Sequence, residues 1–243
     1  MMMQTTKERN RCASVGRFRI PVTVLLAVLL LFLVHAEAPC AAPTPATAAA
    51  AAAPAIATRG TTPSECIRNL LEQAMAVQTD PALQGPAFRE RRRSAIRAII
   101  GANFAFPTMA ENALGPQWQK LTAAQRAEFE AIFRDLFQDS YTKLVLDFLQ
   151  RERIIYGKEE THDGKATVKT ILMRPNEEIP IDYTLIRSGT SWLVADVTID
   201  GVSIVGNYRI SFARVLKRDS YPGLLKKMRL QQQAIEKDAG KKP

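Results

Sequence analysis

Few residues in this chain have the type and spacing that catalysis requires. His162 lies in a Thr-His-Asp-Gly turn without a partner at a catalytic spacing, and we expect an exposed imidazole there. Asp196 and Asp200 share one face of a predicted strand; paired carboxylates can serve acid–base chemistry, but two solvated side chains are the simpler interpretation. Ser203 lies in Gly-Val-Ser-Ile-Val-Gly, one residue too long for a hydrolase nucleophile elbow, and we expect it to cap a helix. The sequence therefore predicts no catalytic residues.

Metal and nucleotide sites are not predicted either. A zinc site needs several converging Cys, His or carboxylate ligands, and the sequence has no cluster with that spacing. It contains neither a phosphate-binding loop nor a dinucleotide-binding glycine motif. Cys66 falls in an amphipathic segment, where a small buried apolar role is expected. We therefore expect no metal and no resident cofactor.

Positive charge is concentrated in one predicted helix. The formal net charge of +9 falls to +5 if residues 1–36, with five basic residues and one acidic residue, are removed. A mildly basic protein favours anionic surfaces without requiring nucleic acid, so no nucleic-acid partner is expected. The densest cluster is made of Arg89, Arg91, Arg92, Arg93 and Arg97. A solvated helix face accounts for it, and docking onto acidic proteins or anionic headgroups, with Arg91 and Arg92 as candidate contacts, is the alternative.

The composition divides the chain into four regions. Basic residues precede an unbroken apolar run, Val22–Val34, and small residues follow it, which is the order of a secretory signal peptide at 1–36. The run is shorter than the roughly 20 residues that span a bilayer, so an uncleaved anchor is the weaker interpretation. Ala, Pro and Thr dominate 37–62, which we expect to be a flexible tether. One folded domain is predicted at 63–237, followed by a disordered tail at 238–243.

The hydrophobic periodicity of the folded region predicts helices, then strands, then helices. Apolar residues recur every three or four positions in the predicted helices, at 64–77, 88–100, 104–114, 122–149, 203–217 and 224–237. They alternate in the predicted strands, at 153–158, 166–173, 179–186 and 192–199. Thr122 and Gln125 form a capping box at the start of the longest helix. The expected fold is α+β: a curved antiparallel sheet of about four strands, with helices before and after it, enclosing an apolar cavity.

Three stretches of this region resemble the MlaC (toluene-tolerance) family. The first runs from Phe104 to Gln125 and the second from Phe129 to Tyr141. The third, Trp192 to Arg209 followed by Phe212, is the longest and the most specific. They follow the family's order behind a signal peptide. The arginine-rich helix and the Ser-Tyr-Pro-Gly connection at 220–223 look closer to HpnM, the branch associated with hopanoids.

The resemblance implies a periplasmic lipid carrier that catalyses no reaction. Family members carry phospholipid between an outer-membrane lipoprotein complex and an inner-membrane ABC transporter complex, which maintains outer-membrane asymmetry. The implied cargo is a phospholipid or a hopanoid, and the implied partners are those two complexes, with transient membrane contact. A small-molecule enzyme and a ligand-free envelope adaptor on the same fold are the alternative functions.

A lipid carrier needs an interior that its own side chains leave partly empty. Each exposed CH₂ costs about 0.8 kcal/mol in water, so a long hydrocarbon chain needs apolar walls. The candidate lining residues are Phe104, Met109, Phe129, Phe133, Leu136, Tyr141, Tyr183, Val197, Ile199, Val202, Tyr208 and Phe212. Ordinary core packing explains each of them equally well, because the same periodicity serves both roles. Arg209, beside Tyr208, is a further candidate for contact with a headgroup or partner.

Overall fold

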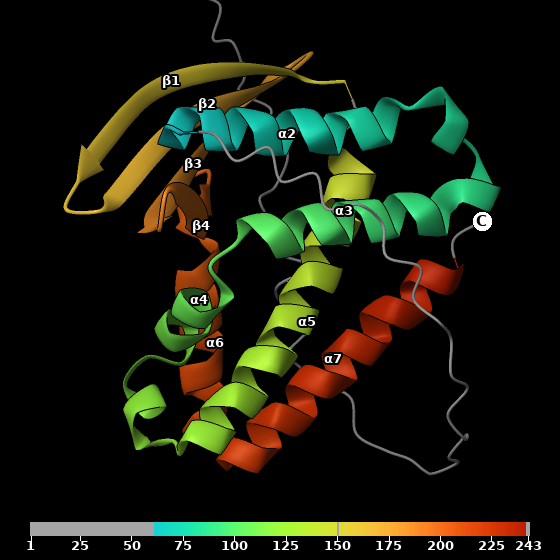
Figure 1. Cartoon of the computed structure of the whole chain (residues 1–243). Coiled ribbons are helices and arrows are strands. Elements are labelled where there is room, and N and C mark those ends of the chain that lie inside the picture. The colour runs from blue at the N-terminus through green and yellow to red at the C-terminus, as the bar shows by residue number, and fades with distance from the viewer. Residues whose placement is uncertain (1–60, 150, 242–243) are drawn as a thin grey trace, which may run out of the picture. The chain divides into compact units, whose positions relative to one another are not determined.

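The computed structural model describes residues 61–149 and 151–241 (Figure 1). The predicted signal peptide 1–36 and nearly all of the predicted tether 37–62 lie outside the described residues. Within the described ranges, no helix combines the length and the hydropathy needed to cross a membrane.

Helices occupy the first part of the domain. The α-helices are α2 (Pro63–Thr79), α3 (Arg89–Asn103), α4 (Phe106–Leu114) and α5 (Ala123–Phe148), with short 3₁₀ helices at Pro81–Leu83, Pro86–Phe88 and Gly115–Lys120. The predicted capping box of α5 is confirmed: the Thr122 hydroxyl accepts from the backbone N–H of Gln125, whose side chain accepts from the backbone N–H of Thr122. An equivalent box, made by Thr62 and Glu65, starts α2. Two orphan N–H groups are thereby satisfied at each of these helix starts.

A five-stranded antiparallel meander follows, in the order β1-β2-β3-β4-β5. Its strands are β1 (Arg153–His162), β2 (Lys165–Arg174), β3 (Glu177–Ser188), β4 (Ser191–Ile199) and β5 (Val202–Ser203). The sequence predicted about four strands, and the fifth is a two-residue addition. Asp200-Gly201 forms a tight turn into β5 with positive φ at both residues, like Asp163-Gly164 between β1 and β2. Such turns connect antiparallel neighbours.

One face of the sheet, here called the inner face, packs against helices. Val168, Tyr183 and Val197 are paired across β2, β3 and β4 on this face, and all three are buried. Helix α2 runs along the sheet (Figure 1), where the backbone N–H and the hydroxyl of Ser64 donate to the carboxylate of Glu159 in β1. The guanidinium of Arg68 lies 4.0 Å from the centre of the Tyr156 ring. The predicted α+β class, with helices before and after the sheet, is confirmed.

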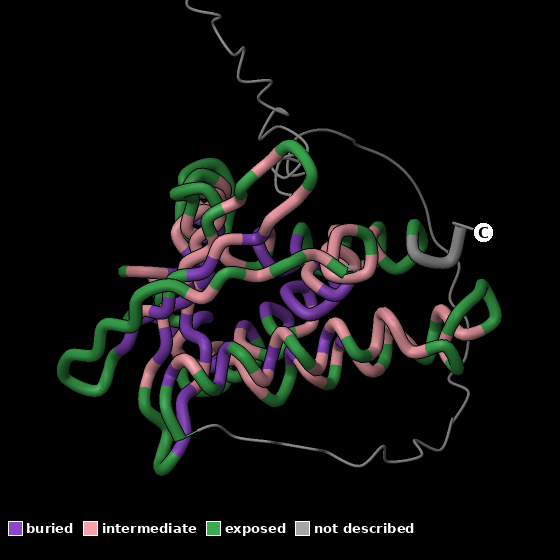
Figure 2. Tube along the Cα trace, turned by 90° about the horizontal axis from the view of Figure 1, so that it is seen from above, coloured by how far each residue is buried: buried purple, intermediate pink, exposed green. Residues whose placement is uncertain are grey.

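Two helices complete the domain. Helix α6 (Ile204–Leu216) begins at Ser203, whose hydroxyl accepts from the backbone N–H of Gly206 at 2.8 Å, so the predicted N-cap is confirmed. Helix α7 (Tyr221–Lys241) runs beside α5 (Figure 1) and starts earlier and ends later than the predicted 224–237. Both helices return to the helical layer, and the buried residues lie in the interior of the domain, between the helices and along the strands (Figure 2).

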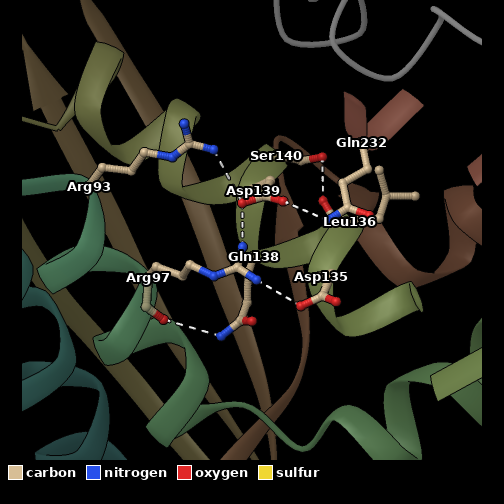
Figure 3. Close-up of polar contacts among 8 residues, drawn as sticks. All are labelled: Arg93, Arg97, Asp135, Leu136, Gln138, Asp139, Ser140 and Gln232. Atoms are coloured by element: carbon tan, nitrogen blue, oxygen red, sulfur yellow. Dashed lines mark hydrogen bonds and ion pairs between the residues drawn. The ribbon is translucent and has the colours of Figure 1, made fainter. Parts of the chain in front are cut away.

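A buried carboxylate joins three helices (Figure 3). Asp139 of α5, whose side chain is only 3% exposed, pairs with Arg93 at 3.4 Å and with Arg97, both from α3. Its other oxygen accepts from Gln232 of α7 at 3.2 Å. Arg97 also reaches Asp135, one turn earlier on α5, at 2.7 Å. Two arginines of the basic cluster therefore point into the domain, so a wholly solvated helix face was the wrong prediction for them.

Candidate lipid-binding site

Six of the predicted lining residues lie together in the helical layer. Phe129, Phe133 and Leu136 of α5, Met109 of α4 and Phe212 of α6 are fully buried, and Tyr208 of α6 is 3% exposed. The ring centres of Phe133 and Tyr208 are 5.3 Å apart, and those of Phe129 and Phe212 are 5.7 Å apart, in edge-to-face contacts. Such geometry is favourable between aromatic rings. These side chains pack on one another.

Sequence reasoning left two aromatic residues of this cluster out of the candidate site. Phe137 lies 5.5 Å from Phe104 and 5.8 Å from Phe106, measured between ring centres. Phe106 is buried although it stands at the first position of α4, and Phe104 is half-buried beside the sheet, where the Ala105 N–H donates to the carbonyl of Val194. The apolar stripe of α5 already contained Phe137. The contact that brings in Phe106 joins separate helices, and helical spacing alone does not predict it.

Tyr141 lies where the aromatic cluster meets the sheet. Its ring centre is 4.2 Å from that of Phe137. Burial raises the pKa of the Tyr141 hydroxyl well above its usual value, with smaller contributions from Tyr208 and from Asp196 of β4. The Tyr141 side chain as a whole is half-buried, so it lies at the margin of the aromatic cluster.

The predicted sheet residues divide by their position. Tyr183 and Val197 face each other across β3 and β4 and are buried, while the next inner-face pair, Ile181 and Ile199, is only partly covered. Val202 pairs with Ile199 at the short edge strand and is 40% exposed. Cover by the helices thus decreases along the inner face from Tyr183 towards Ile181.

The two halves of α5 differ in their cover. Between Phe129 and Phe137 the large apolar side chains are buried, whereas no residue from Lys143 to Leu149 is buried. Five of those seven residues are large and apolar, namely Leu144, Val145, Leu146, Phe148 and Leu149, and all five are only half-buried. Incomplete burial of several large apolar side chains in succession leaves apolar area that a further apolar contact would remove from water. We call these five residues the α5 apolar wall.

Three elements converge at this wall. The side-chain amide of Gln78, at the end of α2, donates to the carbonyls of Val145, Leu146 and Leu149 at 2.7–3.2 Å. The guanidinium of Arg174, at the end of β2, donates to the carbonyl of Phe148 at 2.7 Å and lies 5.7 Å from the centre of its ring. The last carbonyls of α5 are thereby satisfied by side chains from two other elements. The end of the wall is held between α2 and the sheet.

A shallow basic hollow lies beside the end of the wall. It is lined by Arg151, Glu152, Arg153, Met173, Arg174 and Pro175. Arg151 and Arg153 are exposed, and Arg174 is 3.8 Å from Glu152. The three arginines outnumber the single carboxylate, so the hollow favours an anionic group.

The three arginines predicted to contact a headgroup or partner have different surroundings. Arg92 donates to the carbonyls of Leu83 and Gly85 and so fixes the loop before α3. Arg91 is exposed, and its guanidinium lies 5.6 Å from the centre of the Phe88 ring. Arg209 is exposed on α6. Their predicted contacts stay predictions.

Of the residues considered for catalysis, Asp196 and Ser203 stabilise a helix start, and His162 is exposed. One oxygen of the Asp196 carboxylate accepts from the backbone N–H of Val205 at 3.0 Å and the other from the hydroxyl of Ser203 at 2.5 Å, so Asp196 stabilises the start of α6. This corrects the expectation of a solvated side chain. His162 is 90% exposed in the predicted turn, beside Asp163. Cys66 is buried, as expected, and no three His, Cys, Asp or Glu side chains in the described part of the chain could together hold a metal.

A solved structure shares this fold. It is described as the phospholipid-binding protein from Ralstonia solanacearum in complex with a phospholipid. It aligns with a TM-score of 0.62 at 19% sequence identity, over 71% of this chain and 98% of that one. At this identity the match establishes the fold.

Comparison by sequence gives a family. A search of curated proteins found no match. The family model for the MlaC protein matches residues 68–230, which is about two thirds of the chain and runs from within α2 to the first half of α7. The chain belongs to the MlaC protein family.

Proposed function

We propose that this protein is a periplasmic carrier that holds a phospholipid, or a hopanoid, and moves it between the inner and outer membranes. It receives or delivers its cargo at an inner-membrane ABC transporter complex and an outer-membrane lipoprotein complex. Family membership and the fold shared with a phospholipid-binding protein support this function. The engagement of Asp196 in the start of α6 and the exposed position of His162 favour binding over catalysis.

The observation that carries the proposal is the incomplete burial of the α5 apolar wall. A domain of this size buries most of its large apolar side chains, and the first half of α5 does so. The wall instead stays partly uncovered where Arg174 of β2 reaches the carbonyl of Phe148, and the inner face of the same sheet is only partly covered at Ile181 and Ile199. A hydrocarbon chain placed there completes the apolar packing. The arginines of the adjacent hollow suit the phosphate of a phospholipid.

Filling the space beside the wall tests this placement. Replacing Ile181 with Trp on the inner face adds a large ring where the lipid chain is expected, so the amount of co-purified lipid should fall several-fold. Ile186→Trp is the matched control. Ile186 also lies on β3 and is half-buried like Ile181, but its side chain is on the opposite face of the sheet. Lipid per protein is measured by native mass spectrometry and by extraction of the purified proteins.

Two results count against the proposal. Equal lipid content in Ile181→Trp and Ile186→Trp, with both variants folded, excludes the inner face as the binding wall. Wild-type protein purified from its own envelope without any lipid excludes the carrier function itself.

A further inference from the structure

The net positive charge of the folded chain comes from one segment. Residues 204–230 contain seven basic residues and one acidic residue, whereas the rest of 61–241 contains 19 basic and 21 acidic residues. The seven are Arg209, Arg214, Lys217, Arg218, Lys226, Lys227 and Arg229, and all are exposed. We call them the α6–α7 basic surface. Outside this surface the described chain is close to neutral.

Most of this charge is not neutralised by the protein. Lys227 pairs with Asp219 at 3.2 Å and Arg229 pairs with Glu128 at 2.7 Å. Within residues 61–149 and 151–241, no ion pair involves the other five members. By contrast, Arg93 and Arg97 of the α3 cluster are bound to Asp139. The α6–α7 basic surface therefore offers more exposed basic side chains to an anionic partner than the α3 cluster does.

Exposed apolar side chains lie among these charges. Ile210 of α6 is 59% exposed and Leu230 of α7 is 54% exposed, more than any other large apolar residue described. Ile210 precedes Arg214 by four residues, and Leu230 follows Lys226 by four, so each apolar side chain has a basic neighbour on the same helix face. Buried residues such as Tyr208 and Phe212 on α6, and Leu224 and Met228 on α7, occupy the opposite faces.

We infer that the α6–α7 basic surface docks the protein onto a bilayer that contains anionic phospholipid. Basic side chains attract the anionic headgroups, and apolar side chains among them enter the headgroup region. An acidic protein would satisfy the charges but would leave Ile210 and Leu230 in water unless it also offered apolar contacts. Charges distributed over two helices and the connecting turn suit an extended surface.

This inference goes beyond lipid carriage, because docking concerns the outside of the domain and the cargo concerns its inner face. Each basic residue near an anionic membrane strengthens binding by about five-fold, and salt weakens the attraction. Reversing three charges of the surface is therefore expected to weaken binding by more than about ten-fold, even if they do not all contact the membrane.

Vesicle binding tests the inference with protein purified from cells that express the full chain. Co-sedimentation is measured with phosphatidylcholine vesicles and with vesicles of roughly one third phosphatidylglycerol, at about 0.05 M and about 0.5 M NaCl. We expect binding only to the anionic vesicles and a steep loss at high salt. The triple variant Lys217→Glu, Arg218→Glu, Lys226→Glu should bind at least ten-fold more weakly. Ile210→Ser should weaken binding several-fold with no change in charge.

A charge-matched control separates the surface from net charge. The triple variant Lys158→Glu, Lys165→Glu, Lys169→Glu changes three exposed residues of β1 and β2 by the same total charge. It should retain most of the wild-type binding. Equal loss in the two triple variants, or no vesicle binding by the wild type, would overturn the inference. Lipid content measured on the same samples reports on the carrier function separately.

Discussion

At the scale of single residues, the hydroxyl groups of three tyrosines make the stability of this domain depend on pH in the alkaline range. Tyr208 is 3% exposed between α5 and α6, and burial raises the pKa of its hydroxyl to about 12, although a hydrogen bond with Ser140 opposes part of the shift. The pKa values of Tyr141 and Tyr183 are raised as well, mainly by burial. The folded state therefore keeps protons that the unfolded chain releases near pH 10.

Alkaline pH is expected to destabilise the protein through these groups. The stability that these protonated hydroxyls contribute is fully present below about pH 10, the tyrosine pKa in the unfolded chain. It is lost as the pH rises through the tyrosine pKa of the folded state. Tyr208 alone contributes a slope of up to about 1.4 kcal/mol per pH unit in the free energy of unfolding between pH 10 and 12. Tyr208→Phe should reduce this slope, as measured by urea unfolding at several pH values. An unchanged slope would show that Tyr208 ionises without cost in the folded protein.

At the scale of the elements, the Asp139 cluster determines how α3, α5 and α7 pack. Replacing Asp139 with Asn leaves Arg93 and Arg97 facing a neutral group in a partly buried place, and the free energy of unfolding should fall by about 3 kcal/mol. Asp135→Asn is the matched control one turn away, because Asp135 is 47% exposed and binds the same arginine. Its cost should be at most about 1 kcal/mol.

Chemical denaturation of the two variants compares these costs directly. Similar losses for both would mean that Asp139 is no more important than a surface ion pair. The same comparison reports on α7, since Gln232 loses its charged acceptor only in the Asp139 variant.

Local sequence patterns were sufficient to predict the helices, strands and turns, but not how far other elements bury their apolar faces. The capping box at Thr122, the turn at Asp163-Gly164 and the N-cap at Ser203 each depend on neighbouring residues, and all were predicted from the sequence. Helical spacing shows which face of α5 is apolar, but it carries no information on how far other elements cover that face. The buried half at Phe133 and the half-buried wall at Leu146 therefore show the same apolar spacing in the sequence. The inward direction of Arg97 depends on Asp139, 42 residues away.

At the scale of the whole molecule, the proposed carrier function predicts coupling between cargo and stability. A ligand that binds only the folded state raises its stability, so removal of bound lipid should lower the melting temperature by several degrees. The loss should be local as well: amide exchange should accelerate in residues 143–149 and change little in 129–137. Differential scanning fluorimetry and hydrogen exchange before and after delipidation check both expectations. Uniform acceleration in both halves of α5 would contradict the assignment of the wall.

The two edges of the sheet are closed by different means. The free side of β4 is occupied by β5 at one end and by the bridge from Phe104 to Val194 at the other. β1 leaves one side open, but its pairing is irregular between Tyr156 and Glu159, and Lys158, Glu159 and Glu160 put charges on the outermost strand. Irregular, charged edges discourage strand addition from a second copy. At high concentration this protein should therefore resist forming fibrils by edge-to-edge strand pairing, even though some apolar side chains stay exposed.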